Sequence, residues 1–555
     1  MTENEQLTEN EQRYRALAET EATRWSALVS DDVRSWSAIW DAAVARHPSR
    51  IVVEEVETGA QYTYAGLDAL SRRVTAWALA HPAPAVGVLL PNGAAILAVV
   101  IGLTRAGVPA ILFNPREPAA RHALLAERTG VWVVLGDPID GVETISTTVL
   151  FSTAPFVGAA PVEGRSLDDT AAVIFTSGTT GPSKGARFPH RRLIGAGVAW
   201  ALRAQLSATD RCYIPLPLCH GNALAVAFAA VVESGGRAVV RRRFSVSAFR
   251  EDIERCGCTA MVYIGELWRY LLNSPPRVGD DQIGLRVVFG NGLTGALWRP
   301  TLDRWGIRHV VEHYGATEMP AGALTNWMGR EGACGYLPPG HRDRDGVRLV
   351  HENGETVPVG EAGEIWLRIG EEGWAGYWDH RYDAAKRVED PISGEVWWRS
   401  GDRLREDAEG FFTFIERLGD GFRYKGENVS ASEVEAALVA SGDFDEVVVY
   451  GMALPSVSGA VGVGSVRPRS AAFAFSPGDL AARLGRHLAP WSIPRLLCVM
   501  AERHETTATL KISRQALAGR RFDIDNARWF VLEHARYLPL SPARMRALES
   551  GEEGL

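Results

Sequence analysis

The sequence predicts an α/β fold: a large N-terminal domain with parallel-sheet α/β subdomains, followed by a small mobile C-terminal α+β domain. Three observations support this prediction. The chain has 555 residues, too many for one hydrophobic core. Helical patterns alternate with short apolar runs from about Trp36 to about Arg417, and this alternation ends there. We therefore expect a polar, flexible leader at 1–35, a large domain at 36–418 and a small domain at 419–555.

The leader is polar and of low complexity. Within residues 2–13, "TENEQL" is followed by the nearly identical "TENEQR". Such a segment buries too little apolar surface to offset the conformational entropy lost on ordering, so we expect it to be frayed or disordered. Its acidic, polar composition also argues against a secretory signal.

Short apolar runs in the large domain predict the buried strands of a parallel sheet, which is covered on both faces. Between two of these runs, residues 94–107 predict a buried helix that ends at Gly107, a residue suited to a left-handed C-cap. Residues 223–232 also predict a buried core helix. The predicted strands are 86–91, 110–113, 131–136 and 171–175.

The pattern changes in residues 422–452. A charged turn is followed by a helical pattern of about ten residues and then by a β-branched strand. We expect this segment to begin a compact separate domain that reaches the C-terminus.

Composition excludes several classes of function. The formal charge of −8 is a poor match to a nucleic-acid binder, which usually presents a basic face. No run of about eighteen apolar residues occurs, so no membrane span is expected. The six cysteines are scattered, and the Cys256–Cys258 pair has no second pair nearby, so zinc is not expected. Free thiols in the core predict a reducing, cytoplasmic location.

The segment directly after the strand at 171–175 is rich in glycine and hydroxyl side chains. It reads "TSGTTGPSKG", residues 176–185. Glycines allow the backbone to approach a ligand closely, and successive N–H groups form a nest for an anion. Lys184 adds a positive charge. The spacing is not that of a Walker loop, because glycine follows Lys184, but the segment still predicts a polyphosphate site rather than a linker.

The stretch "FTSGTTGPSKG" resembles the phosphate loop of the adenylate-forming superfamily, which contains acyl-CoA synthetases, adenylation domains and luciferases. Nearly the whole chain from about residue 36 can be matched to that superfamily. Four further stretches resemble its fatty acid transport protein-like acyl-CoA synthetase branch: "YIGELWRYLLN" (263–273), "FGNGL" (289–293), "HYGATE" (313–318) and "ERLGDGFRYKGENVSASEVE" (416–435).

The resemblance implies an ATP-dependent, AMP-forming ligase. Such an enzyme activates a carboxylic acid as acyl-AMP, releases pyrophosphate and transfers the acyl group to CoA, with ATP, Mg²⁺ and CoA as its small molecules. The N-terminal membrane anchor of the eukaryotic members is absent from the sequence, which suggests a soluble bacterial-type enzyme. Two alternatives stay open: a diazotase that activates nitrite and transfers it to an aryl amine, and a non-catalytic nucleotide-binding regulator.

The resemblance also implies a nucleotide site. Glu318 would bind Mg²⁺ and act in catalysis, because this hard cation prefers oxygen ligands. Tyr314 would lie against adenine, and Asp402 would accept hydrogen bonds from both ribose hydroxyls. Arg417 would reach the ribose or a phosphate. The other expected nucleotide contacts are Thr176, Ser177, Gly178, Thr179, Thr180, Gly181 and Lys184 at the phosphates, Gly290, Asn291 and Gly292 beside adenine, and Gly315, Ala316 and Thr317.

Three more positions carry roles by resemblance. Lys511 in "TTATLKIS" would bridge the carboxylate of the acid and the α-phosphate. His220 in "LPLCHGNAL" would be the gate between the acid pocket and a thiol tunnel. Gly419 and Asp420 would form the hinge about which the small domain swings between two poses, moving Lys511 out and "YKGENVS" (424–430) in.

The sequence departs from the pattern of the branch at several positions. Met319-Pro320 replaces a small and polar pair at the acyl pocket, and Cys219 replaces an aromatic residue. These two departures weaken the expectation of a long-chain fatty acid, so a smaller or aromatic acid of secondary metabolism is an equal candidate. Thr507 stands where glycine is common, and Ser400 replaces threonine.

Overall fold

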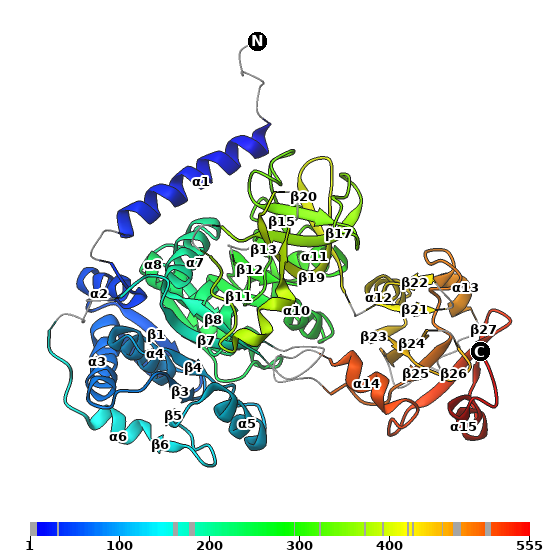
Figure 1. Cartoon of the computed structure of the whole chain (residues 1–555), viewed down its shortest axis with the longest axis horizontal. Helices are drawn as coiled ribbons and strands as arrows, with labels where there is room; N and C mark the ends of the chain where they lie inside the picture. The colour runs from blue at the N-terminus through cyan, green and yellow to red at the C-terminus, as the bar shows by residue number, and fades with distance from the viewer. Residues whose placement is uncertain are drawn as a thin grey trace, which may run out of the picture.

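A large lobe built on three β-sheets is followed by a small lobe built on a five-stranded sheet and a two-stranded hairpin (Figure 1). The predicted α/β architecture with a small α+β lobe is confirmed. The structure is a computed structural model, and it describes residues 8–29, 33–158, 165–176, 184–293, 295–320, 324–370, 373–390, 393–418, 421–424, 427–457, 459–469, 479–505 and 512–555.

The first α/β sheet contains the four strands that the apolar runs predict. They pair in parallel, and almost all of their residues are buried, as expected for strands covered on both faces. One antiparallel strand, β8, follows the glycine-rich loop back along β7. The order is β6 (Glu143–Ile145), β5 (Val133–Gly136), β3 (Val86–Leu89), β4 (Ala110–Leu112), β7 (Thr170–Thr176) and β8 (Lys184–Pro189).

The second α/β sheet has eight strands, and its centre is also parallel. Antiparallel strands lie only at its two edges. The order is β14 (Leu324–Asn326), β13 (His309–Tyr314), β12 (Val287–Asn291), β11 (Ala260–Ile264), β9 (Arg211–Ile214), β10 (Arg237–Val240), β1 (Ile51–Glu55) and β2 (Gln61–Thr63).

Helix α4 (Ala94–Ala106) packs against strands of both sheets, because it contacts β1 of one and β3, β4 and β7 of the other. A helix that is hydrophobic on every side must be buried in this way. Gly107 ends it with φ 76°, in the left-handed conformation that glycine adopts without strain. Both the predicted helix and its predicted C-cap are confirmed.

The remaining helices of the large lobe cover the two sheets. The segment predicted as a core helix at 223–232 is buried, but it begins as a π-helix, η1. The bounds are α2 (Trp36–Arg46), α3 (Tyr64–Ala80), α5 (Ala119–Thr129), α6 (Thr147–Ser152), α7 (His190–Arg203), η1 (Asn222–Phe228), α8 (Ala229–Ser234), α9 (Phe249–Cys256), α10 (Gly265–Leu272), η2 (Asp280–Gln282) and α11 (Gly295–Trp305).

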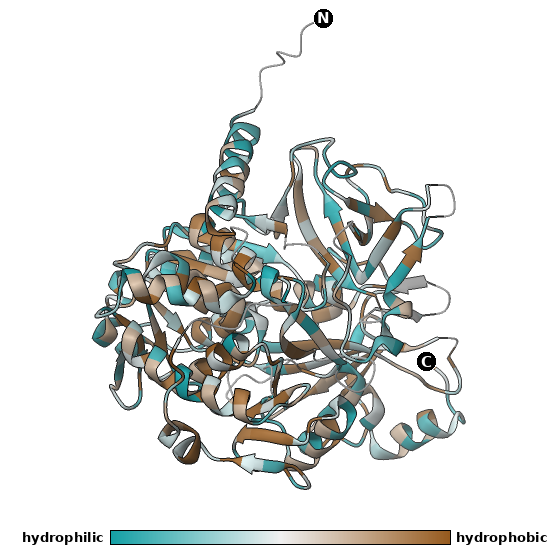
Figure 2. Cartoon of the chain, turned by 60° about the vertical axis from the view of Figure 1, so that its left-hand side comes forward, coloured by the Kyte–Doolittle hydropathy of each residue, from teal (hydrophilic) through white to brown (hydrophobic). Residues whose placement is uncertain are grey.

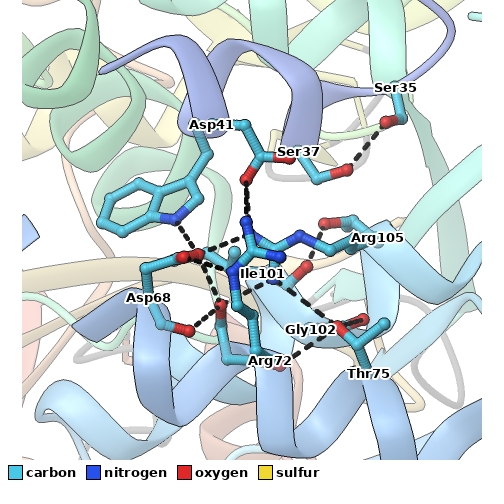
Figure 3. A network of polar contacts seen from close by, with 12 residues as sticks. Ser35, Ser37, Asp41, Asp68, Arg72, Thr75, Ile101, Gly102 and Arg105 are labelled. Atoms are coloured by element: carbon cyan, nitrogen blue, oxygen red, sulfur yellow. Dashed lines mark hydrogen bonds and ion pairs between the residues drawn. The ribbon is translucent and has the colours of Figure 1, made fainter. Parts of the chain in front are cut away.

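A buried arginine ties three of these helices together (Figure 3). Arg105 of α4 is completely buried, and its Nη2 lies 2.6 Å from carboxylate oxygens of both Asp41 in α2 and Asp68 in α3. Its Nη1 donates to the Ser71 hydroxyl at 2.7 Å, and Arg72 pairs with Asp68 at 2.6 Å. The cluster satisfies a charge that would otherwise be costly to bury.

The structure corrects the prediction of a flexible leader for one part of it. Residues Glu9–Leu28 form a helix, α1, which begins with a capping box between Thr8 and Glu11. None of its residues is buried, and it is coloured mainly teal and white in Figure 2. Ion pairs from Glu21 to Arg203 at 2.7 Å and from Arg24 to Glu233 at 2.5 Å attach it to α7 and α8. Tyr14, Trp25 and Leu28 are partly buried against the hydrophobic clusters of the large lobe, so polar and apolar contacts together hold the helix.

The third sheet is antiparallel and completes the large lobe. One irregularity matters for the site: the pairing of β17 with β19 shifts between Glu364 and Trp366, so that β19 bulges at Ser400–Asp402. The strands are β15 (Gly335–Tyr336), β20 (Phe411–Arg417), β19 (Val396–Glu406), β17 (Ala362–Arg368) and β16 (Val347–Val350), with β18 (Arg387–Glu389) beside β19 and the short helices η3 (His380–Tyr382) and η4 (Ala384–Lys386) before it.

The small lobe has its own hydrophobic core. The helix and the β-branched strand that the sequence predicts are confirmed as α12 (Ala431–Ala440) and β23 (Phe444–Met452). Gly419 and Asp420 lie outside the described residues, so the domain boundary stays a prediction. The other elements are β21 (Phe422–Tyr424), β22 (Glu427–Val429), β24 (Val461–Pro468), α13 (Leu480–Leu484), β25 (Leu496–Val499), α14 (Arg514–Arg520), β26 (Arg528–Glu533), β27 (Arg536–Pro539) and α15 (Pro542–Ser550).

Within the described residues, the two lobes touch at helix α10 and where α12 lies beside β20. At α10, Asn273 Nδ2 donates to the Asp445 carbonyl at 2.8 Å. Arg269 lies 3.8 Å from the Glu446 carboxylate, and the Arg503 guanidinium lies 5.2 Å from the centre of the Tyr270 ring. The contacts at α10 are polar, as expected for an interface that opens easily.

All six cysteines are buried and form no disulfide, as predicted. Burial raises the pKa of Cys219 to about 12, so this thiol is protonated and unreactive at neutral pH. Within the described residues, no group of three or more His, Cys, Asp or Glu side chains is arranged to hold a metal ion. A search of the same residues finds no helix with the length and apolarity needed to cross a membrane.

Candidate functional site

Most of the predicted site residues that the structure describes lie at the carboxyl ends of parallel strands. β7 ends at Thr176, β12 ends at Asn291, and β13 ends at Tyr314. In open α/β sheets, this edge is where ligands bind, because loops and unpaired backbone groups converge there.

Lys184 and Thr176 mark the two ends of the glycine-rich loop. The Thr176 hydroxyl donates to the Lys184 carbonyl at 3.3 Å. The Lys184 ammonium lies 4.9 Å from the centre of the Tyr382 ring and 5.6 Å from that of Tyr377. These cation–π contacts orient the positive charge without neutralising it, which leaves it available to an anion. Ser177, Gly178, Thr179, Thr180 and Gly181 lie outside the described residues.

Glu318 is held from two sides. Trp374 Nε1 donates to its backbone carbonyl at 2.5 Å, and the Tyr377 hydroxyl donates to Oε1 at 3.2 Å. Among the residues that the structure describes, its other carboxylate oxygen, Oε2, has no hydrogen-bond partner. One free carboxylate oxygen without further protein ligands fits Mg²⁺, which usually completes its shell with water and phosphate oxygens.

Tyr314, Asp402 and Arg417 form a hydrogen-bonded row. The Tyr314 hydroxyl donates to Asp402 Oδ2 at 2.9 Å, and Arg417 Nε donates to Asp402 Oδ1 at 2.8 Å. Burial and the neighbouring carboxylate raise the pKa of Tyr314 well above its usual value. Asp402 is 3% exposed, so a carboxylate with spare acceptor sites is held rigidly beside the aromatic ring.

The segment Gly290–Leu293 is anchored from beneath by residues that the sequence analysis did not identify. Gly292 N donates to Glu312 Oε1 at 2.5 Å, and the Tyr263 hydroxyl donates to Oε2. Burial raises the pKa of Glu312 to about 8. His313 Nδ1 donates to the Gly290 carbonyl at 2.6 Å.

Two glycines in this segment are required by geometry. A side chain at Gly290 would place its Cβ 2.1 Å from the Tyr263 carbonyl oxygen, so the strands β11 and β12 can approach only if this residue is glycine. Gly292 has φ 88°. The close approach at Gly290 is therefore made to the backbone of the neighbouring strand, and the expected position of this segment beside adenine stays a prediction.

His220 lies beside the Asn114 side chain, just before a second asparagine contact. Its Nε2 is 3.2 Å from Asn114 Nδ2, at the end of β4, in the first sheet. Directly after it, the π-helix η1 begins at Asn222, whose amide donates to Asn291 Oδ1 at 2.8 Å. The second bond ties the segment that carries His220 to the segment at 290–293. π-Helical turns often occur at functional sites.

Arg192, near the start of α7, holds the segment that carries Glu318. Its Nη2 donates to the Ala316 carbonyl at 2.8 Å and its Nη1 to the Thr317 carbonyl. The guanidinium lies 4.4 Å from the centre of the Phe188 ring, and burial lowers its pKa to about 10, so it stays protonated at neutral pH. The guanidinium of Arg192 thus links strand β8, through the Phe188 ring, to the segment at 315–318.

Sequence reasoning found the residues that lie within recognisable motifs and missed their supports. Lys511, Gly419 and Asp420 lie outside the described residues, so their predicted roles stay predictions. Tyr263 and His313 lie within quoted motifs but were given no role, and the other supporting side chains lie outside those motifs; for several of them the only available hint was a position near a strand end. They are Asn114, Arg192, Tyr263, Glu312, His313, Trp374, Tyr377 and Lys386.

Comparison with known proteins identifies the family. The AMP-binding enzyme family matches residues 40–378. Long-chain fatty acid transport protein 1 of Homo sapiens is 30% identical over 575 residues, covering 92% of this chain and 87% of that protein. The medium/long-chain-fatty-acid–CoA ligase FadD6 of Mycobacterium tuberculosis is 30% identical over 520 residues, covering 88% and 86%.

A solved structure shows the same fold. The o-succinylbenzoate CoA synthetase MenE of Bacillus subtilis, in complex with the acyl-adenylate intermediate OSB-AMP, superposes with a TM-score of 0.71 at 24% identity. The match covers 87% of this chain and 98% of that one. The chain therefore belongs to the AMP-binding enzyme family and is an ATP-dependent, AMP-forming ligase.

Proposed function

We propose that this enzyme activates a carboxylic acid with ATP and transfers the acyl group to CoA. In the first step, a carboxylate oxygen of the acid attacks the α-phosphorus, the bond to the β-phosphate oxygen breaks, and acyl-AMP and pyrophosphate form. In the second step, the CoA thiolate attacks the acyl carbonyl and AMP leaves, which yields the thioester.

One observation carries the proposal: the segment Tyr314–Glu318 connects the surroundings of the Lys184 ammonium with two carboxylates, those of Glu318 and Asp402. Glu318 accepts a hydrogen bond from Tyr377, whose ring supports Lys184. At the other end of the segment, Tyr314 donates to Asp402. A nucleotide that lay along this segment would meet a cation at its phosphates and a carboxylate at its ribose.

Each residue then has a role that its surroundings support. Asp402, fixed by Arg417 and Tyr314, would accept hydrogen bonds from the ribose hydroxyls. Lys184 would neutralise phosphate charge at the end of the glycine-rich loop. Glu318 would bind Mg²⁺, which would supply further positive charge to the phosphates.

Two proposed roles belong to residues outside the described ranges. Lys511 would bridge the acid's carboxylate and the α-phosphate, where negative charge builds up in the transition state. Gly419 and Asp420 would act as the hinge that replaces Lys511 by the segment at 424–430 for thioester formation. The small, polar contact between the lobes at α10 suits a small lobe that must move.

His220 would stand between the acid and the incoming thiol. Its hydrogen bond with Asn114 and the link from Asn222 to Asn291 hold it between the two α/β sheets. A change of the His220 rotamer at this position would open or close the path between the acid pocket and the thiol tunnel. This is the motion that the proposed gate requires.

We further propose that the acid is smaller than a long-chain fatty acid, or aromatic. The names of the two relatives refer to medium- and long-chain fatty acids. In this chain, however, Met319 is 2% exposed, and its sulfur lies 2.8 Å from the Ala316 amide nitrogen, so the thioether occupies space next to Tyr314–Glu318. Buried Cys219 takes less space before His220 than an aromatic ring would.

Product analysis by mass spectrometry tests the proposal. The purified protein is given ATP, Mg²⁺ and CoA with a panel of short, aromatic, medium-chain and long-chain acids, and we expect thioester and AMP from the short or aromatic acids. Thioester from long-chain acids alone would refute the substrate class. A second arm with nitrite and aminobenzoic-type amines, without CoA, would reveal a diazotase; a diazonium product there and no thioester would refute the ligase.

Replacement of Lys511 tests the catalytic centre. We expect Lys511→Ala to lower the rate of AMP formation by about 100-fold or more, because a cation at developing charge is lost. Arg520→Ala, a nearby exposed arginine in α14, serves as the control and should retain the rate. Equal rates of AMP formation in Lys511→Ala and the control would contradict the proposed role.

A further inference from the structure

Lysine is rare in this chain. Of 59 basic residues, four are lysines, at positions 184, 386, 425 and 511. Lys184, Lys425 and Lys511 lie in segments for which a role in the reaction is already proposed. Lys386 lies in none of them. Since almost every other basic position in this chain is arginine, we ask what Lys386 does.

Lys386 lies beside the bulge that carries Asp402. In the ladder between β17 and β19, Trp366 pairs with Arg399 and Glu364 pairs with Arg403. Three residues of β19, Ser400–Asp402, therefore stand opposite the single residue Ile365. A bulge of this kind re-aims a side chain and leaves backbone groups without ladder partners.

Two side chains satisfy the backbone groups that the bulge exposes. Lys386 Nζ donates to the Ser400 carbonyl at 2.6 Å, and Gly401 N donates to Glu364 Oε1 at 2.8 Å. The Ser400 hydroxyl also accepts from Asp402 N at 2.9 Å. Gly401 has φ 82°, a conformation that glycine adopts without strain. Unmade bonds at such buried groups would be costly, so the bulge depends on these partners.

The charge of Lys386 also faces the nucleotide site. Among the described residues, its ammonium forms no ion pair within 4 Å, and it lies 5.3 Å from the centre of the Trp398 ring. Burial lowers its pKa, and the carboxylates of Glu318, Asp402 and Glu364 partly oppose this effect, while Arg417 adds to it. A positive charge without a direct carboxylate partner can balance the carboxylates of Glu318 and Asp402 while leaving their oxygens free.

We propose that Lys386 is a positioning residue for ribose recognition: it holds the Ser400–Asp402 bulge and thereby aims the Asp402 carboxylate at the ribose hydroxyls of ATP. This inference rests on the proposed role of Asp402. Lys386 itself touches the Ser400 backbone, so its effect on the nucleotide passes through the position of Asp402.

Discrimination between ATP and 2′,3′-dideoxy-ATP tests the inference, and it needs no knowledge of the acid. Binding of both nucleotides, with Mg²⁺, is measured calorimetrically for the wild type, Lys386→Met, Lys386→Arg and Asp402→Asn. The control is Arg387→Met, which removes a cation from the adjacent exposed position. The wild type is expected to prefer ATP by about 10-fold or more, because the analogue lacks hydroxyls that bond to a charged group.

We expect Lys386→Met to lose most of this preference, Lys386→Arg to keep part of it, and Arg387→Met to keep all of it. A merely structural loss would weaken binding of both nucleotides equally and leave the ratio unchanged; that result would overturn the inference. If Lys386→Met does not fold, Lys386→Arg decides the test. The longer arginine side chain cannot place its N–H donor where the lysine ammonium lies. An unchanged ratio of the affinities for ATP and 2′,3′-dideoxy-ATP in Lys386→Arg would then count against the proposal.

Asp402→Asn separates this inference from the proposed function. If Asp402→Asn keeps the preference for ATP, the ribose role of Asp402 is wrong, and the inference falls with it. If Asp402→Asn loses the preference and Lys386→Met keeps it, only the inference is wrong. The double variant Lys386→Met/Asp402→Asn should discriminate no less than Asp402→Asn alone, because both changes act on one interaction.

Discussion

At the scale of single residues, the site depends on side chains that support other side chains. Arg192 illustrates this, since both arms of its guanidinium bind consecutive carbonyls at Ala316 and Thr317. Those carbonyls belong to the residues directly before Glu318. Because a loop follows its backbone anchors, removal of this fork would let the carboxylate of Glu318 move.

We therefore predict that Arg192→Met raises the Mg²⁺ concentration needed for half-maximal AMP formation by about 10-fold, the usual cost of losing a support behind a metal ligand. Excess Mg²⁺ should restore part of the rate. Arg191→Gln, at the next position of the same helix and in a surface pair with Asp168, is the matched control and should leave the Mg²⁺ dependence unchanged. An unchanged Mg²⁺ requirement in Arg192→Met would show that the fork has no influence on Glu318.

At the scale of elements, the buried cluster around Arg105 joins α2, α3 and α4 (Figure 3). Arg105→Met removes one partner and leaves Asp68 buried with Arg72 and the Trp40 indole, which donates to it at 3.0 Å. Breaking a buried pair in this way typically costs about 3–5 kcal/mol.

We expect Arg105→Met to lower the free energy of unfolding by about 3 kcal/mol, at the lower end because the Asp68 carboxylate keeps the hydrogen bonds from Arg72, Trp40 and Ser71. Urea unfolding measures it. Arg46→Gln changes an exposed arginine of α2 and should stay within about 0.5 kcal/mol of the wild type. A loss below about 1 kcal/mol in Arg105→Met would mean that the methionine packs as well as the ion cluster, as some buried pairs allow.

Two buried histidines, in α7 and β13, make the elements that surround the site sensitive to acid. Burial lowers the pKa of His190 and of His313 to about 4. Above about pH 6.5, both are neutral in the folded and the unfolded chain. As the pH falls from 6.5 towards 4, the unfolded chain takes up protons that the folded chain does not, so stability is lost.

This loss should reach about 3 kcal/mol per histidine near pH 4. His190→Asn keeps an acceptor for the Trp36 amide but cannot be protonated, so its unfolding free energy should fall less steeply between pH 6.5 and 4 than that of the wild type. The raised pKa of Glu312 increases the stability of the folded chain as the pH falls through part of this range. Glu312 is present in both the wild type and His190→Asn, so the comparison of these two proteins removes its effect. Parallel pH profiles would contradict the prediction.

At the scale of the whole molecule, the described residues of the two lobes meet at helix α10 through polar contacts. If the small lobe moves as proposed, these contacts set how often the present arrangement is populated. We predict that Asn273→Ala, which removes the hydrogen bond to Asp445, shifts the equilibrium away from this arrangement by about 2- to 10-fold, the value of one hydrogen bond.

Fluorescence energy transfer between dyes on the two lobes measures this shift. Ser274→Ala, at the adjacent residue whose hydroxyl donates only within the large lobe to the Leu271 carbonyl, is the control. An equal distance distribution in Asn273→Ala and the control would show that the contact at α10 does not govern the arrangement of the lobes.

The strands β3, β4, β5 and β7 and the helix α4 could be predicted from the sequence because each is encoded by contiguous residues. The glycine-rich loop predicted an anion site from contiguous residues as well, and that site stays a prediction. The helix α1 was missed because the polar, low-complexity residues at its start predicted a flexible leader. Ion pairs to α7 and α8 hold it together with the partly buried side chains of Tyr14, Trp25 and Leu28, whose partners are distant in the sequence.

The sequence by itself thus determined the fold class, the positions of the buried elements and the motifs that would meet a nucleotide. Only the tertiary structure decided which distant side chains support those motifs: Glu312 under Gly292, Arg192 behind Glu318, and Lys386 at the bulge before Asp402. The physical reason is that such meetings depend on strand order, on register and on a bulge of β19. These properties arise from the packing of whole sheets, and no local pattern of residues specifies them.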